Sequence, residues 1–185
     1  KPKDFDIATS ATPELVHKTF KRSRLIGRRF RLVHIMFSSR KYIEVATFRS
    51  GKVKTASDGS IVRDNLYGTL KEDAFRRDFS VNGLYYDIQK SQVIDYVEGL
   101  KALNSSEIRM IGNPVERFKE DPVRMIRAIR FKVKLGAKID PKISKSISNQ
   151  AHLLDNIPAA RLYDECIKLF HNENAYEVFE ELLKF

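Results

Sequence analysis

Carboxylates near the start of the chain could bind a metal ion. Asp4 and Asp6 flank Phe5 in a segment, residues 3–9, that is typical of a short strand. Side chains alternate between the two faces of a strand, so Asp4 and Asp6 are expected on one face, about 7 Å apart, with Phe5 facing a core. Two carboxylates at this spacing suit a hard cation such as Mg²⁺. The alternative is a solvated Asp-x-Asp at a strand end, since short motifs match often by accident.

Glu44 is a third carboxylate, and it interrupts a largely apolar strand predicted over residues 41–48. Burying an isolated carboxylate is very costly, so Glu44 is expected either at an exposed edge or beside a cation. In the second case it would complete a metal-binding trio with Asp4 and Asp6. His34 lies in the preceding predicted strand, residues 31–38; we interpret it as a packed or edge histidine and leave it out of the site.

A row of arginines follows Asp121-Pro122, which predicts the start of a helix that Gly136 ends. Its arginines share a face that differs from the apolar stripe, and a solvated helix surface is the alternative interpretation. Asp121 and Arg124 are three residues apart and are expected to pair. The stripe consists of Val123, Ile126, Ile129 and Val133, and the arginines are Arg124, Arg127 and Arg130.

The net charge of +10 and the sequence pI of 9.7 favour a polyanionic partner such as nucleic acid, with a membrane surface as the weaker alternative. The single Cys166 excludes an intrachain disulfide and is expected in the core. No apolar run is long enough to span a bilayer, so we expect a cytoplasmic protein. Basic residues cluster early in the chain, where a solvated face is again the alternative: Lys18, Lys21, Arg22, Arg24, Arg28, Arg29 and Arg31.

The remaining elements indicate an α+β head followed by a helical domain. A helix capped by Thr12, with Pro13 first, is expected to bury Leu15, Val16, Thr19 and Phe20 and to break near Gly27. Thr69 is expected to cap a helix through residues 71–77. Further strands are predicted at residues 84–86, 92–97 and 108–111, and further helices at residues 141–150, 158–170 and 174–184.

Together these motifs resemble the class II nucleotidyltransferase family, which contains bacterial poly(A) polymerases and CCA-adding tRNA nucleotidyltransferases. The resemblance implies a polymerase β-like head with a mixed sheet over residues 1–112 and an all-helical, nucleotide- and RNA-binding neck over residues 113–185. The matching motifs are the catalytic Asp4-Phe5-Asp6, Glu44, the nucleotide-binding block Arg76-Arg77-Asp78-Phe79-Ser80-Val81-Asn82 and the neck motif Glu120-Asp121-Pro122-Val123-Arg124.

The resemblance also implies the reaction. An RNA 3′-hydroxyl would attack the α-phosphate of ATP at two Mg²⁺ ions held by Asp4, Asp6 and Glu44, and Glu44 is alternatively the proton acceptor. Residues 25–35 resemble the signature of the poly(A) polymerase branch, which uses ATP alone.

Each arginine group has an implied role. Arg77, Asp78 and Asn82 would bind triphosphate and ribose with Arg76 in support, Asp121 and Arg124 would select adenine, and Arg127 and Arg130 would extend toward the phosphates or RNA. Arg22, Arg24, Arg28 and Arg29 would hold the RNA backbone or face the incoming nucleotide.

Two rival functions stay open: a CCA-adding enzyme, and a non-catalytic RNA-binding module on the same fold. A family member is expected to carry a Gly-Gly and Arg-Asp segment before Asp4, so we expect this chain to be part of a longer enzyme. The sequence does not identify RNA-degradation or RNA-chaperone partners.

Overall fold

The computed structural model describes residues 5–27, 31–38, 41–51, 54–55, 61–63, 66–171 and 173–185. Asp4, Arg28 and Arg29, three of the predicted site residues, lie outside the described residues. The chain divides into two compact units, Lys1–Arg76 and Arg77–Phe185. This division concerns compactness alone, and the functional boundary expected between residues 112 and 113 stays a prediction.

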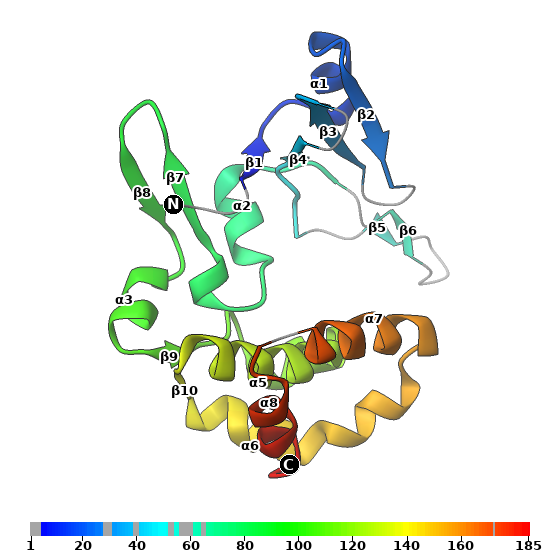
Figure 1. The fold of residues 1–185 in the computed structure, drawn as a ribbon. Helices are drawn as coiled ribbons and strands as arrows, with labels where there is room; N and C mark the ends of the chain where they lie inside the picture. The colour runs from blue at the N-terminus through cyan, green and yellow to red at the C-terminus, as the bar shows by residue number, and fades with distance from the viewer. Residues whose placement is uncertain are drawn as a thin grey trace. The chain divides into compact units, whose positions relative to one another are not determined.

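The first unit contains a four-stranded mixed sheet with the order β1-β4-β3-β2, as the resemblance implied (Figure 1). Strand β1 runs parallel to β4, whereas β3 is antiparallel to both β4 and β2. The described elements of this unit are β1 (Asp6–Thr9), α1 (Pro13–Thr19), β2 (Ser23–Ile26), β3 (Leu32–Met36), β4 (Tyr42–Thr47), β5 (Lys54–Thr55), β6 (Ile61–Arg63) and α2 (Leu70–Phe75).

Helix α1 packs on one face of this sheet. Val16 of the helix contacts Val33 and Val45, and all three are buried. The predicted start of α1 is confirmed, because the Thr12 side chain accepts a hydrogen bond from the Leu15 amide and Pro13 is the first helical residue.

Three predictions about this unit were wrong. Leu15 and Phe20 are about half exposed and Thr19 is exposed as well, because α1 covers the sheet with a single narrow contact around Val16 rather than with a broad stripe. Phe5 is 59% exposed, since it precedes the paired residues of β1. The helix ends at Thr19, and the residues expected to prolong it toward Gly27 instead form β2, which pairs with β3.

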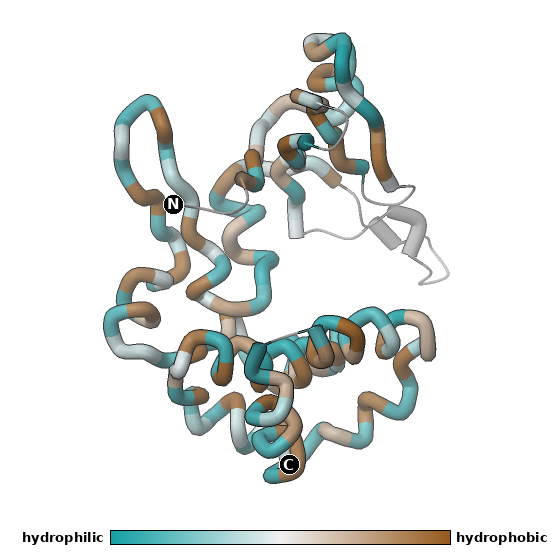
Figure 2. Tube along the Cα trace, viewed as in Figure 1, coloured by the Kyte–Doolittle hydropathy of each residue, from teal (hydrophilic) through white to brown (hydrophobic). Residues whose placement is uncertain are grey.

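The second unit is built around α5, and Figure 2 shows hydrophobic and hydrophilic residues alternating along its helices. Two pairs of strands, β7–β8 antiparallel and β9–β10 parallel, accompany the helices. The elements are η1 (Ser80–Asn82), β7 (Leu84–Asp87), β8 (Gln92–Asp95), α3 (Gly99–Asn104), β9 (Glu107–Ile108), α4 (Pro114–Glu120), α5 (Val123–Leu135), β10 (Lys138–Ile139), α6 (Pro141–Gln150), η2 (Ala151–Asn156), α7 (Ala159–Phe170) and α8 (Ala175–Leu182).

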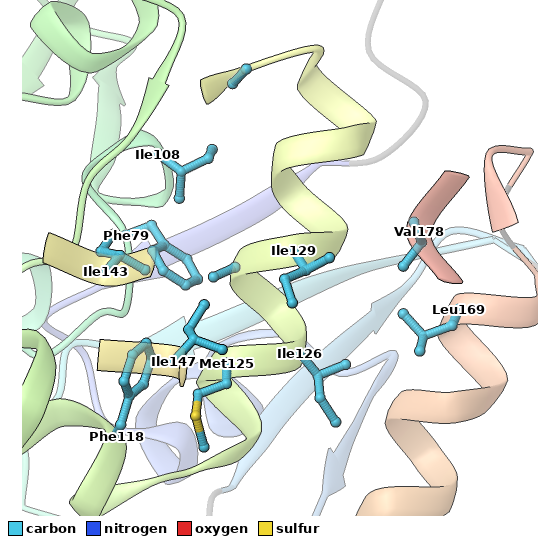
Figure 3. Close-up of a cluster of buried hydrophobic side chains, with 12 residues drawn as sticks. Phe79, Ile108, Phe118, Met125, Ile126, Ile129, Ile143, Ile147, Leu169 and Val178 are labelled. Carbon is cyan, nitrogen blue, oxygen red and sulfur yellow. The ribbon is translucent and has the colours of Figure 1, made fainter. Parts of the chain in front are cut away.

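The core of this unit surrounds the apolar side of α5 (Figure 3). Each fully buried Ile or Phe contributes roughly 1.5–3 kcal/mol to folding. The predicted end of α5 is confirmed, since Gly136 caps it in the left-handed conformation with φ of 58°. Cys166 is half-buried rather than part of the core. The labelled core residues are Phe79, Ile108, Phe118, Met125, Ile126, Ile129, Ile143, Ile147, Leu169 and Val178.

Among the helices that the structure describes, none combines the length and the apolar character that a membrane crossing requires.

Candidate active site

Asp6 and Glu44 are register partners on neighbouring parallel strands. Residues opposite each other in adjacent strands project from the same face of a sheet, so the two carboxylates share a face. Val45, the neighbour of Glu44, points to the side that α1 covers, so the carboxylates belong to the other side. Glu44 is accessible there, with 39% of its side chain exposed. Whether Asp4 lies on this face stays a prediction.

The donor chemistry of this pair fits a hard divalent cation, which prefers carboxylate oxygen. Within the described ranges no group of three or more His, Cys, Asp or Glu side chains lies close enough together to hold a metal ion. Asp4, which would be the third carboxylate, is not among the residues described. Asp6 and Glu44 therefore have the donor chemistry that such a cation prefers, and that they bind one stays a prediction.

The basic stretch is partly described. Arg22 and Arg24 are exposed, and Arg24 lies in β2 opposite His34 of β3. Arg31 is engaged elsewhere, because its Nη1 lies 2.9 Å from Oε1 of Glu14. Arg22 and Arg24 are thus accessible to a phosphate backbone.

Arg76, the last residue of the first unit, contacts the buried Asp73. Its Nε and Nη2 lie 2.8 Å and 2.7 Å from Oδ1 of Asp73. The same oxygen accepts the Arg49 amide at 2.9 Å. Thr69 and Glu72 form a capping box that starts α2 and so places Asp73 in its first turn. These contacts are those of a structural arginine.

Asp78 lies at the centre of a charged cluster in the second unit. Its Oδ1 accepts hydrogen bonds from the Phe79 amide at 2.8 Å and from Nδ2 of Asn82 at 3.0 Å. Its Oδ2 accepts a hydrogen bond from Nε of Arg127 at 2.8 Å and forms an ion pair with Nη2 of the same residue at 2.6 Å. Burial by itself would raise the pKa of Asp78, but Arg127 and these hydrogen bonds outweigh burial and hold that pKa below its ordinary value.

Arg77 is oriented by its neighbours in the turn. Its Nε donates to the Tyr85 hydroxyl at 2.9 Å, and its Nη1 donates to the Asn82 carbonyl at 2.9 Å. The guanidinium also lies 4.8 Å from the centre of the Tyr85 ring. The structure therefore brings Arg77, Asp78 and Asn82 together, and that they bind nucleotide stays a prediction.

The predicted pairing of Asp121 with Arg124 was wrong. Oδ2 of Asp121 accepts from Nη2 of Arg161 at 2.5 Å. Nη1 of Arg124 donates to Oε2 of Glu120 at 2.9 Å and to the Arg117 carbonyl at 2.8 Å. Asp121 caps the end of α4 with an extended φ of −154°, so it is not one helical turn before Arg124 on α5. The spacing rule for helix pairs does not apply across this break.

The arginine row on α5 is not a solvated surface. Only 15% of the Arg124 side chain and 13% of the Arg130 side chain are exposed. Arg130 Nη2 lies 3.7 Å from Oε2 of Glu165, and Arg127 Nη1 lies 4.0 Å from Oε1 of the same residue. Burial lowers the pKa of Arg130, and the charge of Glu165 opposes that shift. The row is therefore an organised part of the cluster.

Sequence analysis missed Glu165, a residue that is only 6% exposed. Glu165 forms ion pairs with Lys168 as well as with Arg127 and Arg130. A signal was present: Glu165 lies between Leu162 and Leu169 on the apolar side of α7, at helical spacing. A carboxylate in an apolar stripe needs a cation, as Glu44 also indicated. Arg117 is a second residue that sequence analysis missed. Its Nη1 lies 2.6 Å from Oε2 of Glu120, and its Nη2 donates to the Arg77 carbonyl at 2.6 Å.

Comparisons with known proteins agree with these motifs. Residues 1–109 match the family described as "Poly A polymerase head domain", and residues 136–185 match "Probable RNA and SrmB- binding site of polymerase A". Poly(A) polymerase I of Escherichia coli O6:H1 is 48% identical over all of this chain and 42% of its own length. The CCA-adding enzyme of Enterococcus faecalis is 37% identical over 92% of this chain and 41% of its own length.

The fold is that of a solved relative. The crystal structure of the Bacillus stearothermophilus CCA-adding enzyme in complex with CTP superposes with a TM-score of 0.80 at 33% identity, over 98% of this chain and 43% of that one. The chain spans less than half the length of the curated relatives it matches. The head-domain match covers most of the chain, and the chain belongs to the poly(A) polymerase head domain family, within the class II nucleotidyltransferases.

Proposed function

We propose that this chain carries the catalytic residues of a template-independent RNA adenylyltransferase, which transfers AMP from ATP to the 3′-hydroxyl of single-stranded RNA. The observation that carries the chemistry is the alignment of Asp6 and Glu44 on one sheet face. The identity of 48% to a poly(A) polymerase over the full chain favours ATP as the nucleotide.

Asp6 and Glu44, together with Asp4, would hold two Mg²⁺ ions. When bound, such ions lower the pKa of the attacking hydroxyl and neutralise charge on the leaving pyrophosphate. The carboxylates supply negative charge at a fixed spacing, so they orient the reacting groups rather than forming bonds to them. In the alternative role, Glu44 would accept the hydroxyl proton.

The cluster of the second unit would bind the nucleotide. Arg77 and Arg127 present positive charge suited to a triphosphate, and Asp78 and Asn82 offer polar groups suited to ribose. The hydrogen bonds described for Arg124 use Nη1 alone, so Nε and Nη2 are the donors that it would offer to adenine ring nitrogens. Asp121 would accept the exocyclic amino group.

RNA would bind through the exposed Arg22 and Arg24 and through the C-terminal helices, residues 136–185, which match a probable RNA-binding region. Arg28 and Arg29 belong to the same proposal. Residues 1–112 would then act as the catalytic head and residues 113–185 as the neck. The proposed reaction is a step of mRNA processing in the cytoplasm.

CCA addition is the second candidate, because the matching crystal structure is that of a CCA-adding enzyme bound to CTP. The test is primer extension by the intact protein with ATP and CTP supplied separately, on single-stranded RNA and on tRNA lacking its CCA end. The proposal expects long ATP-only extension of single-stranded RNA. Incorporation of CTP before ATP would contradict it, and a protein that binds RNA but transfers neither nucleotide would be the non-catalytic module.

A further inference from the structure

A row of four polar residues crosses the mixed sheet at one register. Asp6 of β1 is aligned with Glu44 of β4, Glu44 with His34 of β3, and His34 with Arg24 of β2. Aligned residues on adjacent strands share a face, so all four project from the side turned away from α1. The row runs from two carboxylates through a histidine to an arginine.

His34 contacts Glu44 directly. Its Nε2 lies 3.4 Å from Oε2 of the carboxylate, within ion-pair range and somewhat longer than the usual hydrogen bond of about 2.9–3.0 Å. The side chain of His34 is 19% exposed and that of Glu44 is 39% exposed, so the contact is partly shielded from water. The neighbouring strand therefore presents a polar group to one oxygen of Glu44.

The ring of His34 is itself held in place. It stacks on Tyr42 with ring centres 4.0 Å apart and planes inclined by 10°. Tyr42 lies two residues before Glu44 on β4, so the same strand carries the carboxylate and the platform for the histidine. With the ring plane fixed in this way, Nε2 remains directed at Glu44.

A role in the core does not account for His34. The core of this unit consists of Val16, Val33 and Val45 on the opposite side of the sheet, and His34 projects away from it. Polar groups that hold metal-binding carboxylates in one orientation typically change metal affinity or activity by about 10- to 100-fold when they are removed.

We propose that His34 is a positioning residue for Glu44: it engages Oε2 and so fixes the carboxylate in the orientation that binds Mg²⁺. This inference rests on the proposed function. It requires no change in the charge of His34, because a neutral imidazole with hydrogen on Nε2 makes the same contact.

The test measures metal binding apart from catalysis. Mn²⁺ is titrated into the intact protein with a non-hydrolysable ATP analogue, and bound ions are quantified by electron paramagnetic resonance. His34→Leu is expected to weaken Mn²⁺ binding about tenfold and to raise the Mg²⁺ concentration for half-maximal adenylyl transfer by a similar factor. The KM for ATP at saturating Mg²⁺ is expected to stay unchanged.

Two further variants separate positioning from folding. His34→Gln places an amide donor where Nε2 lies and is expected to keep metal binding, whereas His34→Asn is equally polar but too short and is expected to lose it. His152→Leu, at an exposed residue of the second unit, is the control for loss of a histidine. Equal Mn²⁺ affinity in His34→Gln, His34→Asn and the wild type would overturn the proposal.

A double variant tests the route of the effect. With Glu44→Gln in place, His34→Leu is expected to cause no further loss of Mn²⁺ affinity, since the two act through one carboxylate. Additive losses would overturn the inference. If Glu44→Gln itself leaves Mn²⁺ binding and transfer unchanged, the proposed function fails; if Glu44→Gln abolishes both and His34→Leu changes neither, only the role of His34 fails.

Discussion

Arg127 contacts a single oxygen of Asp78 through two nitrogens: Nε donates a hydrogen bond at 2.8 Å, and Nη2 forms an ion pair at 2.6 Å. The two residues are 49 positions apart in the chain, and their contact joins α5 to the turn that contains Arg77 and Asn82. Only 10% of the Asp78 side chain is exposed. Loss of Arg127 would therefore leave a nearly buried carboxylate without its main cation.

Arg127→Ala is expected to destabilise the second unit by about 3–5 kcal/mol, because removing one partner of a buried ion pair leaves the other charge uncompensated. Urea unfolding measures the change. Lys119→Ala is the control, since the Lys119–Glu116 pair is mostly exposed and worth at most about 1 kcal/mol. Equal losses in the two variants would contradict the importance of burial here.

The low pKa of Asp78 predicts a pH-dependent stability. In the folded state the carboxylate stays ionised at pH values below its ordinary pKa of 3.8. The unfolded state therefore binds more protons than the folded state around that pH. The stabilisation is present above that value and is lost as the pH falls toward the folded pKa. Urea unfolding between about pH 5 and about pH 3 should show a decline that is shallower in Asp78→Asn. Parallel profiles for the two proteins would count against this assignment.

Arg124→Ala is expected to reduce the preference for ATP over CTP, because Nε and Nη2 would lose their contacts to adenine. A good two-bond contact to a base is worth about 1–3 kcal/mol of discrimination. The ratio of kcat/KM for the two nucleotides is the measurement, with Lys134→Ala on the same helix as control. A drop in activity that is equal for both nucleotides would assign Arg124 a structural role.

Arg24→Ala is expected to weaken RNA binding for all sequences alike and to reduce the slope of log affinity against log salt by about one phosphate contact. Arg31→Ala provides the matched control, since Arg31 is paired with Glu14. Fluorescence anisotropy with labelled single-stranded RNA over a salt series gives both slopes. An unchanged slope for Arg24→Ala would exclude a phosphate contact.

Local signals in the sequence were sufficient for much of the fold. The ends of helices depend on residues only a few positions apart, so several of them were predictable. The start of α1 follows from Thr12 and Pro13, the start of α2 from Thr69 and Glu72, and the end of α5 from Gly136. Strand β2 was missed because its four residues become a strand only by pairing with β3.

In the candidate site, too, local patterns were predictable from the sequence and contacts between distant residues were not. Asp6 and Glu44 stood out because strand alternation is local, and their common face is seen in the register. The partners of Asp121 and Arg124 could not be derived from spacing. Arg161, the partner of Asp121, lies 40 positions away, and the extended backbone at Asp121 separates α4 from α5. Helical spacing could have singled out Glu165, but its arginine partners follow only from how α7 packs on α5.

Asp6 and Glu44 are the residues on which the proposed nucleotidyl transfer depends most. The most direct test of this dependence compares Asp6→Asn and Glu44→Gln with the wild-type intact protein, in single-turnover extension of RNA by ATP and in RNA binding. Both substitutions keep the side-chain shape and remove the charge. In both variants the rate of AMP transfer is expected to fall at least about a hundredfold, with RNA affinity retained. Transfer at the wild-type rate by either variant would contradict it.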